Sequence, residues 1–343
     1  MAANSWEQLI ASWEPRMRQA FLDAVYQIRD SVKLTELVRL IEAGRIDDAV
    51  RAVGLDPGKF RSMTSTLLAA YEAAGVATML AIPPAAVAAG YTLKISFNAS
   101  AKAAADFLRY RSELLIREIT EDQRRGIRDV LVRGLESGRG PRDVATDLLG
   151  RRNRITGKRE HGLIGLTQTQ QEWARNYARE LATGDPAALK RAMRDAAFDN
   201  RIRRAIAEKR GLTIEEARAP FRAYLHRALR VRADLIARQE MRGALHASQH
   251  EAYLQAIAAG QLDADQIERE WRSRRDERVR STHRKEDSVH QGMDGQVRGI
   301  NELFVSPSGA RLRFPGDPEA PLHETAGCRC YLIPRINFLK GIR

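Results

Sequence analysis

Helical periodicity between residues 99 and 258 is the feature that most restricts the fold of this chain. Apolar side chains recur there at steps of three and four positions, which brings them onto one face of a helix. Aromatic residues make up only 6% of the 343 residues, whereas alanine, arginine and leucine are abundant, as is typical of helical proteins. The sequence therefore predicts a mainly α protein, long enough for about two domains.

Residues 1–95 are predicted to form an N-terminal helical region. The first 50 residues indicate several short helices, because apolar side chains from Trp6 to Val25 keep the helical spacing. Residues 67–87 are rich in apolar side chains, but a glutamate and two prolines interrupt them, so no membrane-spanning helix is expected. Apolar and polar side chains alternate over residues 91–98, which predicts a strand or an extended arm.

Three threonines mark predicted helix starts. In a capping box, the threonine hydroxyl accepts a hydrogen bond from the amide three residues later, and the Gln or Glu at that position bonds back to the threonine amide. The pairs with this spacing are Thr120 with Gln123, Thr167 with Gln170, and Thr213 with Glu216. We also expect one long helix from about residue 220 to residue 258.

The composition changes sharply after Trp271. Glycines and prolines separate short apolar fragments there, which indicates brief strands and turns. The sequence thus divides into a helical region over residues 1–95, a basic helical body over residues 96–260, and a C-terminal module over residues 261–343. The expected architecture is an extended helical body followed by a small, loop-rich α+β module.

Positive charge is concentrated in the second half of the helical body. The formal net charge is +13, and residues 151–240 hold 21 Lys and Arg against 11 Asp and Glu. Such charge favours a polyanionic partner, namely nucleic acid, an acidic membrane face or an acidic protein surface. The side chains expected to contact a phosphate backbone are Arg151, Arg152, Arg154, Lys158, Arg159, Arg201, Arg203, Arg204, Lys209 and Arg210. Solvated helix faces of the same composition are the alternative.

Four side chains of the C-terminal module are candidate zinc ligands. His283, His290, Cys328 and Cys330 form a donor set that suits tetrahedral zinc, and His323 is a fifth candidate. The two cysteines lie two positions apart, so a disulfide scaffold is not expected. A structural zinc and a metal-free core both remain open. In either case we expect Cys328, Cys330 and His283 to converge and to stabilise the module, because a small unit rich in glycine and proline has few apolar side chains for a core.

A set of residues after residue 270 occurs in a characteristic order. In sequence they are Trp271, Asp276, Arg278, Val279, Arg280, His283, Asp294-Gly295-Gln296, Phe304, Pro315-Gly316-Asp317-Pro318 and Cys328-Arg329-Cys330. This order resembles the phage Mu protein F-like family, the minor head or head-morphogenesis proteins of tailed bacteriophages. Upstream segments are similar to the helical region of these proteins: Glu118–Thr120, Gly138–Arg142, Ile164–Thr167 and Arg238–Glu240. The resemblance covers roughly residues 95–335.

The resemblance implies a structural virion component rather than an enzyme. Proteins of this family join the prohead in few copies near the portal, and they help assembly or DNA delivery. The expected partners are therefore the portal protein, the major capsid protein and the phosphate backbone of packaged DNA. The expected location is the phage head, after assembly in the host cytoplasm.

Two alternatives of other classes remain open. One is a metal-dependent enzyme, such as a nuclease or a toxin-like hydrolase, built on the His and Cys cluster. The other is a sequence-specific DNA-binding protein, because residues 126–149 have the rhythm of two helices around a short turn.

Overall fold

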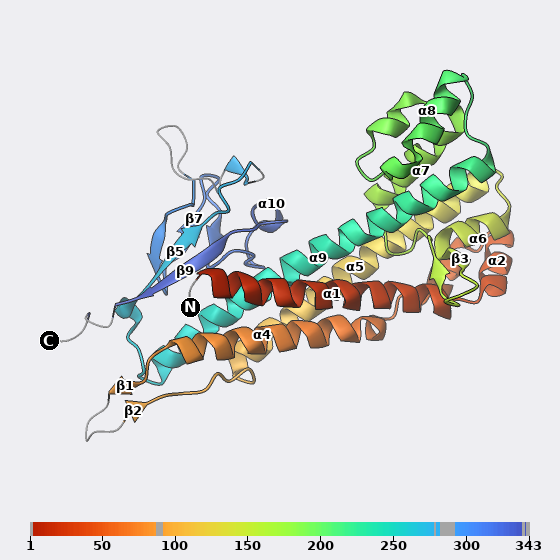
Figure 1. The fold of residues 1–343 in the computed structure, drawn as a ribbon. Helices are drawn as coiled ribbons and strands as arrows, with labels where there is room; N and C mark the ends of the chain where they lie inside the picture. Colours follow the sequence, from red (N-terminus) through yellow and green to blue (C-terminus); the bar gives the residue numbers. More distant parts are fainter. Residues whose placement is uncertain (1–2, 87–91, 278, 282–291, 338–339, 341–343) are drawn as a thin grey trace. The chain divides into compact units, whose positions relative to one another are not determined.

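The computed structural model describes residues 3–86, 92–277, 279–281, 292–337 and 340 (Figure 1). The chain forms two compact units, each assembled from segments that are distant in sequence. The first unit comprises residues 1–17, 63–113 and 235–343, and the second comprises residues 18–62 and 114–234. These units do not follow the consecutive division at residues 95 and 260, because long helices contribute residues to both of them.

The described residues are mainly helical, as the sequence predicted. Helices α1 (Ala3–Ser31), α5 (Lys102–Glu136) and α9 (Ile214–Ala258) each have residues in both units. The expectation of short helices is wrong for α1, which continues through Pro15 for 29 residues. Its apolar face is buried, so packing compensates for the hydrogen bond that the proline removes. Among the described residues, no helix combines the length and the apolar character that a membrane crossing requires.

In the first unit, helix α4 (Arg61–Ala81) is followed by an antiparallel pair of short strands, β1 (Ala85–Ala86) and β2 (Thr92–Leu93). Residues 94–98 then run as the extended arm that the alternating pattern predicted. Ile95 and Phe97 of this arm pack on an apolar core, whose buried members include residues from α4, α9 and the first strand of the C-terminal module.

The C-terminal part of the first unit is a small α+β module, as predicted. Strand β5 (Ile267–Arg272) lies between β6 (Val297–Gly299) and β9 (Tyr331–Ile336) in an antiparallel three-stranded sheet. Strands β7 (Phe304–Val305) and β8 (Arg311–Leu312) form a second pair, and the short helix α10 (Leu322–Thr325) precedes β9 (Figure 1). Trp271 of β5 is fully buried and packs edge-on against Phe304, with ring centroids 5.2 Å apart.

The second unit holds five further helices among its described residues: α2 (Leu34–Glu42), α3 (Ile46–Ala52), α6 (Pro141–Leu149), α7 (Gln168–Thr183) and α8 (Asp199–Ala207). Strands β3 (Arg151–Arg152) and β4 (Arg159–Glu160) form a short antiparallel hairpin after α6. Short 3-10 helices occupy residues 57–60, 186–190 and 196–198 of this unit, and residues 264–266 of the first.

Two of the three predicted capping boxes are confirmed. At the start of α7, Thr167 and Gln170 exchange hydrogen bonds between side chain and backbone, both at 3.1 Å. Thr213 and Glu216 make the same reciprocal contacts at 2.9 and 3.3 Å, immediately before α9. Helix α9 therefore begins at Ile214 rather than near residue 220, and it continues through a proline in its second turn.

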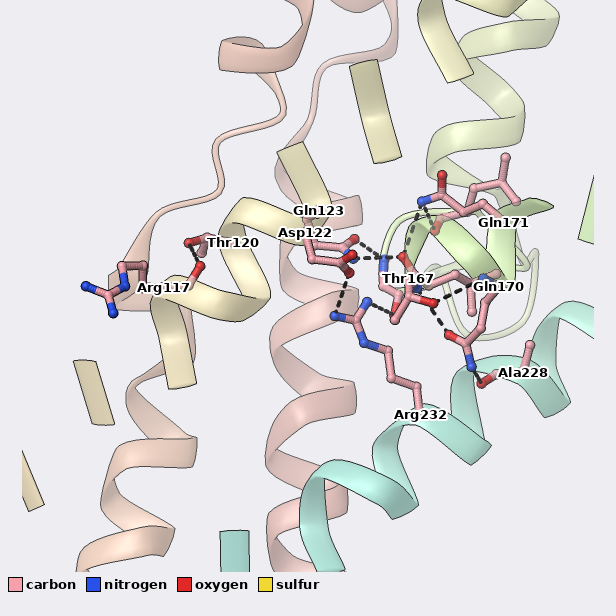
Figure 2. A network of polar contacts seen from close by, with 12 residues as sticks. Arg117, Thr120, Asp122, Gln123, Thr167, Gln170, Gln171, Ala228 and Arg232 are labelled. Carbon is pink, nitrogen blue, oxygen red and sulfur yellow. Dashed lines mark hydrogen bonds and ion pairs between the residues drawn. The ribbon is translucent and has the colours of Figure 1, made fainter. Parts of the chain in front are cut away.

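The third predicted capping box is wrong, because Thr120 and Gln123 lie inside α5. The Thr120 hydroxyl instead donates to the carbonyl of Arg117 in the preceding turn, at 3.0 Å. The Gln123 amide reaches a distant segment, where it accepts from the Gly165 N–H at 2.6 Å and donates to the Leu166 carbonyl at 2.8 Å (Figure 2). A threonine followed three residues later by Gln or Glu thus forms a local cap at two helix starts, whereas in α5 the glutamine makes a tertiary contact.

Candidate functional site

Only half of the predicted zinc ligand set belongs to the part of the chain that the structure describes. His283 and His290 lie outside it. Cys328 and Cys330 are reduced and buried in the loop between α10 and β9. Within the described residues, no group of three or more His, Cys, Asp or Glu side chains is placed to hold a metal ion. A structural zinc, and the convergence of His283 with the two cysteines, therefore stay predictions.

The two cysteines belong to a buried cluster that includes residues of α9. Their side chains are hydrogen bonded to each other, and this contact together with burial raises the pKa of the Cys330 thiol. Arg242 of α9 donates to the carbonyl oxygens of Arg329 at 3.1 Å and Cys330 at 3.4 Å. A protonated, hydrogen-bonded thiol is a weak nucleophile, so this arrangement suits packing better than chemistry.

Two residues of the family-like Asp-Gly-Gln motif connect loops of the C-terminal module. The carboxylate of Asp294 accepts hydrogen bonds from the Ser273 amide at 2.8 Å and from the Arg275 side chain at 3.0 Å. The side-chain amide of Gln296 donates to the Val305 carbonyl at 2.8 Å and accepts from the Val305 N–H at 3.3 Å. The two side chains therefore join their turn to the loop after β5 and to β7, respectively.

The Pro-Gly-Asp-Pro motif has a similar role beside α9. Asp317 accepts hydrogen bonds from the backbone and the side chain of Arg313 and from the Glu319 amide, at 2.6–3.1 Å. The preceding Gly316 has a φ of +81°, and a Cβ atom on it would lie 3.0 Å from the Cα atom of Gly243 in α9. Glycine is required at this position for both the turn and the close approach.

The predicted DNA-contacting residues fall into two groups, and the first lies on the hairpin of residues 151–160. Four of its side chains are exposed, those of Arg151, Arg152, Arg154 and Lys158. Within the described part of the chain, three of the four make no ion pair or side-chain hydrogen bond, the exception being Arg152, which donates to the Gly157 carbonyl at 2.9 Å.

Arg159, the fifth basic residue of the hairpin, is buried and has a structural role. Its backbone N–H donates to the Asp30 carboxylate at 2.9 Å, and its guanidinium donates to the Gly150 carbonyl at 3.2 Å. Asn153 orders the hairpin turn. Its side-chain oxygen accepts hydrogen bonds from the backbone amides two and three residues later, at 2.8 and 3.2 Å. The exposed cations are thus presented by a defined turn.

The second group comprises Arg201, Arg203 and Arg204 on α8, with Lys209 and Arg210 in the turn that follows. Acidic side chains are close to this group. Arg203 faces Asp199 at 3.4 Å, and Arg210 pairs with both Glu208 and Glu216, at 2.7 and 2.8 Å. These carboxylates compensate part of the positive charge that the sequence count attributes to α8.

A cavity of about 560 Å³ lies directly after the hairpin, around His161. It is lined by α1, by residues 160–162 and by the first half of α9. A second cavity of about 350 Å³ is also lined by α6 and α7, and it shares with the first the residues Glu160, His161, Arg218, Arg222 and Leu225. Cavities of this size commonly bind small ligands. We refer to the two together as the His161 cavity.

His161 has a left-handed backbone conformation, with a φ of +61°, which is uncommon for a residue with a side chain. Contacts from α1 hold the chain on both sides of it. Arg29 is buried and donates to the carbonyls of Gly162 at 2.7 Å and Ile164 at 3.0 Å, on the C-terminal side. On the N-terminal side, Asp30 holds the Arg159 amide. The position of the imidazole is therefore imposed by the fold.

Three arginines and two glutamates line the cavity around His161. Arg29 is bound to backbone carbonyls, and Arg218 pairs with Glu215 at 2.7 Å. Arg222 is half-buried, and its guanidinium makes no hydrogen bond or ion pair with any described residue. The Glu160 carboxylate accepts from Asn153 at 3.0 Å within the hairpin. Among the described residues, Arg222 is therefore the unpaired cation of the first cavity, and Arg151, which also makes no ion pair, lines the second.

The imidazole of His161 is uncharged at neutral pH. Burial lowers its pKa, and the positive charge of Arg222 acts in the same direction, whereas Glu160 opposes them. Its Nδ1 atom is buried and makes no hydrogen bond of normal geometry among the described residues. The ring of His226 lies opposite, with centroids 6.5 Å apart. A ligand in the cavity thus meets a fixed neutral imidazole beside a guanidinium.

Sequence reasoning singled out Arg159 and Ile164–Thr167 in this region but missed the cavity residues between and opposite them. One signal was present: Arg222 and His226 are four positions apart on a predicted helix, a spacing that places both on one face. Nothing in the sequence brings that face to His161, because the contact depends on how α1, α9 and the hairpin pack together.

Comparisons with known proteins leave this description unchanged. No family model matches the chain, and no match was found among curated proteins or among solved structures.

Proposed function

We propose that this chain is a structural minor head protein of a tailed phage that acts in prohead assembly near the portal. The proposal rests on one observation, which is that the motif residues are hydrogen bonded inside the C-terminal module. Asp294, Gln296 and Asp317 belong to the order of residues that resembles the Mu F-like family, and each is engaged in hydrogen bonds inside the C-terminal module. Hydrogen bonds of this kind fix the loops of the module, and the portal or the major capsid protein is the partner proposed for its surface.

The proposal includes contact with the phosphate backbone of packaged DNA, without sequence specificity. Arg151, Arg154 and Lys158 supply exposed positive charge on an ordered hairpin, and no carboxylate among the described residues pairs with them. Phosphate contacts need only cations within reach of a regular polyanion. The arginines of α8 are a weaker contribution, because carboxylates face them.

Quantitative mass spectrometry of purified proheads and virions, from the phage that encodes the chain, tests the proposal. We expect few copies relative to the major capsid protein, and density next to the portal in a virion map. Complementation with Asp294→Ala is expected to reduce incorporation, because it removes the bonds to Ser273 and Arg275. Asp265→Ala, an exposed aspartate near the same sheet, is the matched control.

Two results would overturn this function. One is the absence of the chain from both proheads and virions. The other is metal-dependent nicking of plasmid DNA by the purified chain that Cys328→Ser abolishes without unfolding the protein, since such a result assigns the module to catalysis.

A further inference from the structure

We infer that the His161 cavity is a binding site for a monovalent carboxylate that is joined to an apolar group. This site is independent of the proposed role in the phage head. It rests on the charge of the cavity, the nature of its walls and the way its central residue is held.

The carboxylate is expected to bind at Arg222. A guanidinium presents N–H donors in a planar fork that matches the two oxygens of a carboxylate. Arg222 is half-buried at the boundary of the two cavities and has no partner among the described residues. A half-buried guanidinium has lost part of its hydration, and without a partner nothing compensates that loss. An anion bound to it would supply the compensation.

The charge balance favours one negative charge on the ligand. With both histidines counted as neutral, the charged residues that line the first cavity are three arginines and the two glutamates Glu160 and Glu215. A dianionic phosphate would face both carboxylates with only one unpaired guanidinium to compensate. A single carboxylate cancels the charge of Arg222 and leaves the existing Arg218–Glu215 pair intact.

The apolar part of the ligand is expected to occupy the second cavity. Most of its walls are aliphatic or aromatic, with Leu163, Leu181, Leu212, Phe221 and Leu225 among them, and Asp147 and Arg151 add one charge of each sign. Burying an alkyl chain there removes apolar surface from water on both sides. Arg222 lines this cavity as well, so a single molecule spans the cation and the apolar wall.

His161 sits where the two cavities meet and is held before any ligand arrives. Arg29 and Asp30 of α1 fix the backbone around its left-handed conformation. A side chain held in an unfavourable backbone geometry by its surroundings is a common feature of binding sites. Because no reorganisation is needed, the neutral imidazole is already in place beside Arg222 when a ligand binds.

This ligand chemistry has two sources, a free aliphatic acid or the C-terminus of a peptide that ends in an apolar residue. Isothermal titration calorimetry with octanoate and with a short peptide ending in a free leucine carboxylate separates them. Octanamide and the amidated peptide are the uncharged controls. Binding of either carboxylate, with little or no binding of its amide, supports the proposal and identifies the source.

Arg222→Gln is expected to weaken binding of the preferred carboxylate by at least about tenfold, since it removes a charged hydrogen-bond donor. Arg230→Gln changes the same residue type about two turns further along α9, outside both cavities, and is expected to bind as the original chain does. The proposal is overturned if neither carboxylate binds at millimolar concentration, if Arg222→Gln binds unchanged, or if inorganic phosphate binds as tightly as octanoate.

Discussion

The guanidinium of Arg29 donates a hydrogen bond to the carbonyl oxygen of Gly162 at 2.7 Å, although the two residues are 133 positions apart. Burial lowers the pKa of Arg29 to about 10, so the side chain stays protonated at neutral pH. A buried cation is tolerated here because backbone carbonyls of the segment after His161 receive its donors. This contact links the fold of the second unit to the geometry of the His161 cavity.

Replacing Arg29 with methionine is expected to lower the free energy of unfolding by about 2–4 kcal/mol. The variant keeps most of the side-chain volume but leaves buried carbonyl oxygens without donors. Chemical denaturation measures the effect. Arg39→Met, at an exposed position of α2, is the control and should change stability by less than about 0.5 kcal/mol. Equal stability of the two variants would contradict the role given to Arg29.

The two confirmed capping boxes show what the sequence predicts well. The contacts of Thr167 with Gln170 and of Thr213 with Glu216 join residues three positions apart, so local spacing is enough to foresee them. Gln123 has the same spacing to a threonine, yet its side chain bonds to Gly165 and lies inside a helix. Contacts with distant segments determine whether such a pair caps a helix or bonds elsewhere. A local sequence pattern gives no information on those contacts.

The candidate sites show the same limit. The cluster of basic residues was foreseen because charge is a property of composition, but the hairpin that carries it was not, since the sequence predicted helix there. The separation into exposed Arg154 and buried Arg159 depends on Asp30 of α1. The His161 cavity was not foreseen, because it exists only where α1, the hairpin and α9 meet.

Substituting His161 with glycine is expected to raise the free energy of unfolding by about 0.5–1 kcal/mol. Glycine adopts a φ of +61° without the steric cost that a side chain carries there. The same variant should weaken octanoate binding, because the imidazole that lines both cavities is lost. Lys209→Gly, at an exposed residue with a φ of +53°, should stabilise the chain similarly and leave octanoate binding unchanged. A loss of stability on His161→Gly would mean that the imidazole itself holds the segment.

Neutralising the exposed hairpin cations is expected to reduce the salt dependence of DNA binding. With Arg151, Arg154 and Lys158 changed to glutamine, the slope of log K against log salt concentration should fall in magnitude by about 2–3, because each phosphate contact contributes about 0.9. Fluorescence anisotropy with a labelled duplex gives the slope. Changing Lys33, Arg39 and Lys190 to glutamine removes the same net charge from exposed positions elsewhere in the second unit. If both triple variants lower the slope equally, the hairpin has no special part in binding.

Two histidines of the first unit, the buried His246 and the half-buried His250, make stability dependent on pH. Burial, reinforced by Arg242, lowers the pKa of His246 to about 3, and burial, reinforced by Arg269 and Arg313, lowers that of His250 to about 4. In the unfolded chain both groups titrate near pH 6.5, so below that pH the unfolded state binds protons that the folded state excludes. Stability is therefore complete above about pH 6.5 and falls as the pH decreases, by up to about 1.4 kcal/mol per pH unit for each histidine.

Replacement of His250 with glutamine isolates one half of this effect. Urea denaturation at about pH 7.5 and about pH 5 should show a loss of stability that is smaller in the variant by about 2 kcal/mol, since one proton fewer is taken up on unfolding. His226→Gln makes the same substitution at an exposed position of α9 and is the control. If His250→Gln retains the full loss between the two pH values, His250 is charged in the folded chain. In that case a charge must be accommodated next to Phe314, whose ring centroid lies 5.9 Å from that of the imidazole.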